Sequence, residues 1–288
     1  IEGVLVSDHY TFTTAGARNP EGLVRPAELT DELAALTVDW RELPLELLQV
    51  VAPEAPDEVL ADPDNRRFQE LRLAIAGDLT YLATAKALAA REDFDFFAVY
   101  FRGFDLVCHN YWQFWRAGDG PAASAEEQAW FGHIVPNYLV LVDRWLSELL
   151  PMFPAEANVV VVSDHGFYGP RRDRTGTLRK GVAEHRAEGA LIVRSPLYTA
   201  GSRFDRSFVL NVTPTVLALL GLPASQDMPG RVLRDNLSEA ALPYVEHLET
   251  HRIATYASLA PLPPQAVKDD PALDAAVKKQ LRSLGYVD

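Results

Sequence analysis

The sequence predicts an α/β fold in which a mostly parallel central sheet is sandwiched by helices. Apolar runs typical of buried strands occur at residues 96–101, 158–163 and 190–193. Segments with the three- and four-residue apolar spacing of helices precede and separate the first two runs. Because strands separated by helices usually pair in parallel through right-handed crossovers, we expect a parallel sheet.

Helix signals appear in order along the chain. Apolar residues recur every three or four positions across 68–82, and Asp62-Pro63 has the composition of a helix start. Ser124 and Glu127 have the spacing of a capping box, which predicts a helix beginning near residue 125. Pro136 is expected to kink or divide that helix, because proline lacks the backbone N–H that a helix interior needs.

The C-terminal third carries two further helix signals. Thr213-Pro214 opens a short helix that Gly221 ends. The proline-rich stretch 261–264 reads as a linker onto a last amphipathic helix within 265–288. The 288 residues are enough for one large α/β domain.

Composition excludes several classes of function. A net charge of −13 argues against binding of duplex nucleic acid, which needs a basic surface. No apolar run approaches the roughly 20 residues that cross a bilayer, so we expect a soluble protein, although no targeting region is visible and the compartment stays open. The single cysteine, Cys108, rules out an internal disulfide and a cysteine-rich zinc site.

The most informative pattern is an Asp and a His after each of two predicted strands. Asp164 and His165 follow the strand at 158–163 directly. Asp105 and His109 follow the strand at 96–101 and lie four apart, which places them on one face of a helical turn. In open α/β sheets ligands bind beyond the carboxyl ends of the strands, so the two pairs are expected to meet there.

These four side chains indicate a metal site. Nitrogen and oxygen donors without thiolate suit Zn, Mn or a similar divalent ion. Four such donors on two strands indicate two ions, a number that would allow two-metal hydrolysis of phosphate esters. Taken singly, either pair could instead be a turn former or a surface pair.

Three stretches carry a resemblance to a known family. They are Phe104-Asp105 to His109 with Tyr111-Trp112, the run Val-Val-Ser-Asp-His-Gly-Phe at 161–167, and Glu184-His185 with Gly189 to Ile192. The passage 213–231 and the ending 281–286 add to them. On these motifs residues 95–288 resemble the alkaline phosphatase superfamily, and within it the type I phosphodiesterase/nucleotide pyrophosphatase branch.

The resemblance implies roles for five residues. Asp105, His109 and His185 would bind one divalent ion, expected to be Zn, and Asp164 with His165 would bind a second. In the family the second ion also takes an N-terminal Asp and a Thr or Ser nucleophile, which we do not find in this chain.

Residues 1–288 are therefore expected to be the C-terminal portion of one alkaline phosphatase-like catalytic domain. Within it we expect 1–95 to be in part a cap or insertion, and 265–288 to be its C-terminal helix. Without the nucleophile, we expect residues 1–288 alone to have little or no activity.

The expected substrate is a small phosphate ester or nucleotide-like molecule, with hydrolysis of a phosphodiester, pyrophosphate or phosphate monoester bond. Arg171, Arg172 and Arg174 lie in a basic loop that would steer such an anion, or would simply be solvated. Alternatives are a sulfatase or phosphomutase of the same superfamily, or a non-catalytic relative that acts as a binding module. His247 and His251 fit a surface helix, because Leu248 stands where a zincin motif needs Glu.

Overall fold

The computed structural model describes residues 3–7, 23–91, 94–115, 123–169, 184–205 and 207–257. Its α-helices are α2 (Thr30–Ala34), α3 (Leu45–Val51), α4 (Asp57–Ala61), α5 (Gln69–Ala89), α6 (Gly103–Trp115), α7 (Ala125–Phe131), α8 (Ile134–Leu149), α9 (Val212–Leu219) and α10 (Leu242–Thr250). Its strands are β1 (Leu5–Val6), β2 (Val24–Arg25), β3 (Val159–Ser163), β4 (Gly166–Tyr168), β5 (Glu184–Arg186) and β6 (Ala190–Arg194). Within these ranges no helix is both long and apolar enough to cross a bilayer.

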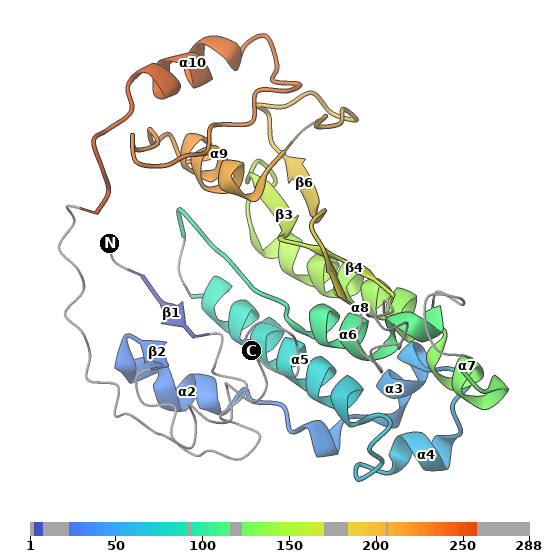
Figure 1. The fold of residues 1–288 in the computed structure, drawn as a ribbon. Coiled ribbons are helices and arrows are strands. Elements are labelled where there is room, and N and C mark those ends of the chain that lie inside the picture. The colour runs from blue at the N-terminus through green and yellow to red at the C-terminus, as the bar shows by residue number, and fades with distance from the viewer. Residues whose placement is uncertain are drawn as a thin grey trace.

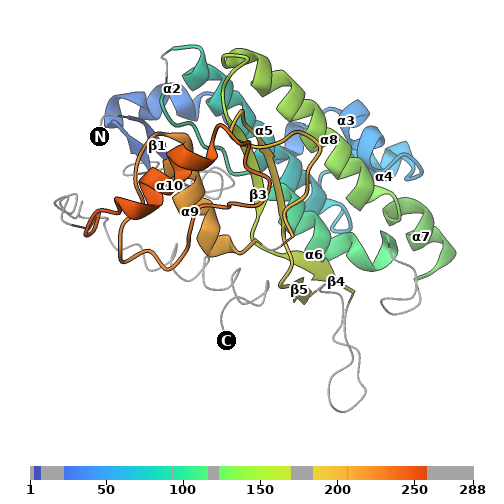
Figure 2. The ribbon, with the colours of Figure 1, turned by 90° about the horizontal axis from the view of Figure 1, so that it is seen from above.

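Helices α5, α6 and α8 form the main layer and pack on one another around the largest apolar core. The strands β3, β4 and β6 lie against this layer, and α9 and α10 lie on the opposite side of the molecule from α4 and α7 (Figures 1 and 2). Because α6 contacts both α5 and α8, its position is fixed from two sides.

Helix α5 confirms the amphipathic pattern, since Leu71 and Ile75 are buried on its inner face. The helix begins at Gln69, whereas the Asp62-Pro63 signal predicted a start just after Asp62. The reason is local: the Asp62 carboxylate accepts a hydrogen bond from the Asp64 N–H at 2.9 Å and stabilises a turn instead.

The capping box at Ser124 and Glu127 is confirmed, with both reciprocal hydrogen bonds present at the start of α7. The division expected from Pro136 is also found, but the break falls at residues 132–133. Pro136 lies in the first turn of α8, where a missing N–H costs no helical hydrogen bond.

The parallel pairing expected from the sequence is not formed among the described residues. All strand pairs there are antiparallel, including β3 with β6 and β4 with β5. The chain leaves β3 through β4 and returns to β6 through β5, and because β4 and β5 pair with each other antiparallel, β3 and β6 also run in opposite directions. The segment 96–101 is extended and alternately exposed, as a strand is, but has no ladder partner in the described ranges.

The antiparallel pairs β3–β6 and β4–β5 follow one another along the chain, and together they are here called the ribbon. The interruption between the two pairs is here called the bulge. Residues 164 and 165 lie opposite three residues, 187–189, because the register changes by one between the β3–β6 and β4–β5 pairs. The backbones approach closely here: a Cβ on Gly189 would meet the Ser163 carbonyl oxygen, and one on Gly166 would lie 2.7 Å from the Glu188 oxygen. Bulges often redirect side chains next to functional sites.

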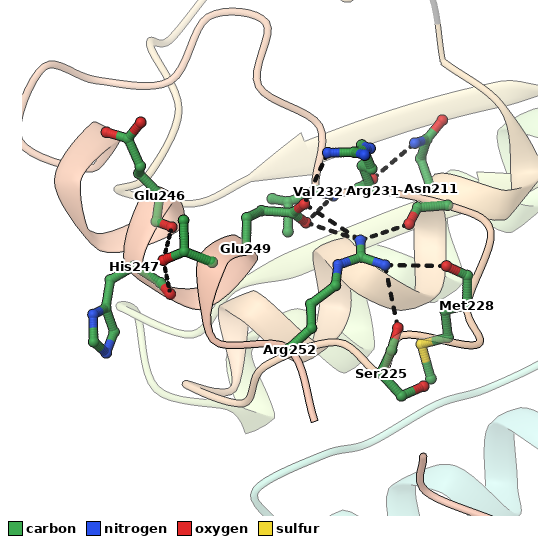
Figure 3. Close-up of polar contacts among 11 residues, drawn as sticks. Asn211, Ser225, Met228, Arg231, Val232, Glu246, His247, Glu249 and Arg252 are labelled. Atoms are coloured by element: carbon green, nitrogen blue, oxygen red, sulfur yellow. Dashed lines mark hydrogen bonds and ion pairs between the residues drawn. The ribbon is translucent and has the colours of Figure 1, made fainter. Parts of the chain in front are cut away.

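The C-terminal part has its own small core between α9 and α10. The Arg252 guanidinium donates hydrogen bonds to the carbonyls of Ser225, Met228 and Gly230 at 3.2, 3.1 and 2.7 Å (Figure 3). The short helix predicted after Thr213-Pro214 is found as α9, and Gly221 follows it with φ of +77°. The predicted helix in 265–288 lies outside the described residues.

Candidate metal centre

The N-terminus of α6 is held by a fully buried carboxylate on α5. Asp78 accepts a hydrogen bond from the Gly103 N–H at 2.9 Å and another from the Tyr138 hydroxyl at 2.8 Å. Gly103 makes this approach possible, because a Cβ there would press on the Tyr138 hydroxyl and lie 2.8 Å from the Ala74 carbonyl oxygen. Two helices, α5 and α8, therefore fix where α6 starts.

Two turns of α6 present the first pair of predicted ligands. Asp105 and His109 lie one helical turn apart, with the Asp105 Oδ1 atom 3.5 Å from the His109 Nε2 atom. Both side chains are turned inward, with exposed fractions of 14% and 3%. The helical face expected from their spacing is therefore the face that packs against the ribbon.

The bulged ribbon brings two more imidazoles to the same point. The Nε2 atoms of His165 and His185 lie 3.7 and 3.8 Å from the Asp105 Oδ1 atom. Their rings stack with centroids 3.7 Å apart and an interplanar angle of 21°. His185 also places its Nε2 atom 2.9 Å from that of His109. One carboxylate oxygen thus faces three imidazole nitrogens from three separate parts of the chain.

Local hydrogen bonds orient His165 toward this cluster. Its Nδ1 donates to the Gly166 carbonyl at 3.2 Å, and its Nε2 atom faces Asp105. The Ser163 hydroxyl donates to the His165 carbonyl at 2.7 Å and stabilises the turn. A histidine whose other nitrogen donates to a backbone carbonyl is the usual arrangement at metal sites.

The electrostatics of the cluster favour a bound cation. The buried Oδ1 atom of Asp105 has no hydrogen-bond partner, and burial raises the pKa of this carboxyl to about 6 despite the opposing effect of His165. Burial, with the charge of His165, lowers the pKa of His185 and so favours the neutral form of that ring. Metal binding needs neutral imidazoles and an ionised carboxylate, and a nearby cation stabilises the ionised carboxylate. The residues present therefore fit a divalent ion.

Asp164 occupies the outer side of the cluster. Its side chain is 72% exposed, and its Oδ1 atom lies 3.7 Å from the His165 Nε2 atom, the same distance as that from Asp105. His165 therefore stands between a buried and an exposed carboxylate. Asp105, His165 and His185 form a group whose ligand atoms all lie within 4.8 Å of one another.

Two other histidines singled out in the sequence lie away from this cluster. His247 and His251 lie at the exposed end of α10, as expected for a surface helix. Arg171, Arg172 and Arg174 lie outside the described residues. Cys108 is fully buried beside the site as a small apolar group.

Two residues next to the site were not predicted from the sequence. Asp78 lies on the buried stripe of α5, three residues after Ile75 and four before Leu82. A charged residue on an apolar helical stripe can be recognised in the sequence and indicates a buried polar contact. Phe167 stands inside the 161–167 motif, where only its apolar character was apparent.

Comparison with known proteins identifies the family of this chain. The family model described as type I phosphodiesterase / nucleotide pyrophosphatase matches residues 38–196, more than half of the chain. The chain belongs to this family, which is part of the alkaline phosphatase superfamily. The match spans the cluster from Asp105 to His185 and also covers 38–95, which the sequence motifs did not reach. No curated protein and no solved structure matches the chain.

Proposed function

We propose that this chain supplies the metal-binding part of a phosphoester hydrolase site that acts on small phosphodiester, pyrophosphate or phosphate monoester substrates. Family membership supports the phosphoester hydrolase class. The observation that carries the proposal is the buried, unpartnered Asp105 Oδ1 atom within 3.8 Å of three imidazole nitrogens. A buried carboxylate oxygen that accepts no hydrogen bond costs folding free energy unless a cation balances its charge.

We assign Asp105, His109 and His185 to one ion, and Asp164 with His165 to a second. The two sets adjoin at His165, whose Nε2 atom is 3.7 Å from both carboxylates. This arrangement supports two neighbouring ions. Donors limited to imidazole nitrogen and carboxylate oxygen suit Zn, with Mn as the other choice.

Bound divalent ions would supply Lewis acidity and would neutralise negative charge on the phosphoryl oxygens of the substrate. The residues of the chain perform the supporting tasks. The Asp78 and Tyr138 contacts hold α6, and α6 holds Asp105 and His109. The exposed side chain of Asp164 lies on the open side of the cluster, where an anionic substrate would arrive. We retain the hypothesis that Arg171, Arg172 and Arg174 in the basic loop steer the anionic substrate to the site.

Metal binding tests this proposal directly. We would measure Zn²⁺ stoichiometry and affinity by equilibrium dialysis with elemental analysis for the wild type, Asp105→Asn and His185→Ala. Each variant should weaken binding by more than the about 10–100-fold that outer-shell partners contribute. Binding of inorganic phosphate, followed with and without Zn²⁺, should require the metal.

His133→Ala is the matched control, because His133 is an exposed histidine that faces Glu54 at 3.5 Å, away from the cluster. It should bind Zn²⁺ as the wild type does. Unchanged metal content in Asp105→Asn and His185→Ala, or an equal loss in His133→Ala, would refute the assignment.

A further inference from the structure

One aromatic ring contacts every histidine of the cluster. Phe167 is buried, with 8% of its surface exposed. Its ring centroid lies 5.0 Å from that of His109, 5.3 Å from that of His165 and 5.4 Å from that of His185. The interplanar angles are 89°, 74° and 85°, so each contact is edge-to-face.

The position of Phe167 follows from the ribbon register. Phe167 is the direct cross-strand partner of His185, so both side chains project from the same face. His165 precedes it by two residues on the same side of the chain, and α6 brings His109 from across the interface with β4. The ring therefore lies where three segments distant in sequence converge.

The phenylalanine ring is itself supported from behind. Trp112 on α6 packs against Phe167 with centroids 5.8 Å apart, and Trp115 meets Trp112 edge-to-face at 4.8 Å. A ring held in this way cannot move aside easily when an imidazole rotates. Because it offers no hydrogen-bonding atom, it does not compete with Asp105 for the imidazole nitrogens.

Imidazole rings rotate about a broad torsion that is roughly two-fold, so a ligand histidine needs neighbours that select one orientation. Hydrogen bonds to the second ring nitrogen usually do this. Edge-to-face aromatic contacts restrict the same rotation through shape and through the ring quadrupole. Phe167 makes three such contacts at once, each to a different proposed ligand.

We propose that Phe167 is a positioning residue whose ring holds His109, His165 and His185 in their metal-binding orientation, so that metal affinity depends on the ring itself. This inference rests on the proposed function. It predicts that replacing the ring with an aliphatic side chain of similar burial weakens metal binding even when the fold is retained.

The test compares Phe167→Leu with Phe131→Leu. Phe131 is equally buried, at 4% exposed, and its ring packs on Phe68 and Phe114 rather than on a histidine. Affinity for Zn²⁺ and Co²⁺, the visible absorption of the Co²⁺-loaded protein, and the Tm of the metal-free protein would be measured for both variants. The Co²⁺ spectrum reports the arrangement of the ligands, which a general loss of stability does not alter.

Both variants should lower the Tm of the metal-free protein, by similar amounts. Phe167→Leu should in addition weaken Zn²⁺ and Co²⁺ binding by about 10–100-fold and change the Co²⁺ spectrum, as loss of an outer-shell partner does. Phe131→Leu should keep the affinity and the spectrum of the wild type. If Phe167→Leu does not fold, Phe167→Met replaces it with the same expectation, because methionine fills irregular apolar space well.

The outcomes separate the two proposals. Wild-type affinity and spectrum in Phe167→Leu, together with loss of binding in Asp105→Asn, would overturn the role of Phe167 and leave the metal site standing. Failure of the wild-type protein to bind either ion, or wild-type binding by Asp105→Asn, would overturn both.

Discussion

Replacing Asp78 with Asn should remove a contribution to stability that falls as pH rises. Asp78 is fully buried between α5, α6 and α8. Burial raises the pKa of its carboxyl from 3.8 to about 7, although hydrogen bonds from Gly103 and Tyr138 and the charge of Arg102 oppose the rise. Asn has nearly the same shape and does not titrate, so comparison of the two proteins isolates the ionisation of Asp78.

The direction of the effect follows from proton linkage. Between pH 4 and pH 7 the unfolded state has lost the Asp78 proton while the folded state keeps it, so stability falls as pH rises. The contribution is fully present below 3.8 and is lost as pH passes through about 7. At about 1.4 kcal/mol for each pKa unit, the whole contribution is about 4 kcal/mol. Of this, about 3 kcal/mol should disappear between pH 5 and pH 8.

Urea denaturation of both metal-free proteins at half-unit steps from pH 5 to pH 8 measures this difference. The free energy of unfolding of the wild type, minus that of Asp78→Asn, should decrease by about 3 kcal/mol across the series. Tyr138→Phe should move the decrease to higher pH, because it removes a hydrogen bond that lowers the pKa of Asp78. A difference that stays flat, or that grows with pH, would refute the reasoning.

Two further predictions concern the backbone. Gly189→Ala should lower the free energy of unfolding by about 1–3 kcal/mol and weaken Zn²⁺ binding, because the new Cβ would collide with the Ser163 carbonyl at the bulge. The control is Gly3→Ala, where a Cβ meets nothing within 4 Å. It should change neither the free energy of unfolding measured in urea nor the Zn²⁺ affinity measured by dialysis. Arg252→Met should cost about 3 kcal/mol in urea denaturation, because it removes charged hydrogen bonds to three loop carbonyls. Its control, Arg231→Met, removes an ion pair at 3.9 Å that is made by an exposed arginine side chain, and should cost less than about 0.5 kcal/mol.

Local patterns in this chain predict local structure well. The capping box at Ser124 and Glu127 and the amphipathic stripe of α5 each depend on residues within one or two turns, and both are found as predicted. The same is true of Asp105 and His109, whose spacing alone places them on one helical face. In each case the interacting groups are close in sequence, so no knowledge of tertiary packing is required.

Strand pairing was not predictable in the same way. The run of valines in β3 has the composition of a buried parallel strand, yet it pairs antiparallel with β6 and leaves Val162 48% exposed. Pairing direction depends on the connection, and nothing in an apolar run encodes which segment returns beside it. Likewise, the bulge that aligns His165 with His185 follows from a one-residue register change between two segments about 20 residues apart. The candidate ligands could be proposed from the sequence, whereas the register change that brings them together could not.

The contacts around α6 explain why the cluster has two supports of different kinds. On the helix side, Asp78 fixes the position of the backbone through the Gly103 N–H, and the ligands follow from the helical repeat. On the ribbon side, the backbone is bulged, and Phe167 is the element that contacts all the rings. A change at Asp78 should therefore act on Asp105 and His109 together, whereas a change at Phe167 should act on ring orientation with α6 in place. Metal affinities of Asp78→Asn, Phe167→Leu and the double variant would test this division. Asp78 sets the position of the α6 backbone and Phe167 sets ring orientation, and His109 is the one ligand that both affect. The two single effects should therefore combine nearly additively in free energy, and a large coupling between them would contradict the argument.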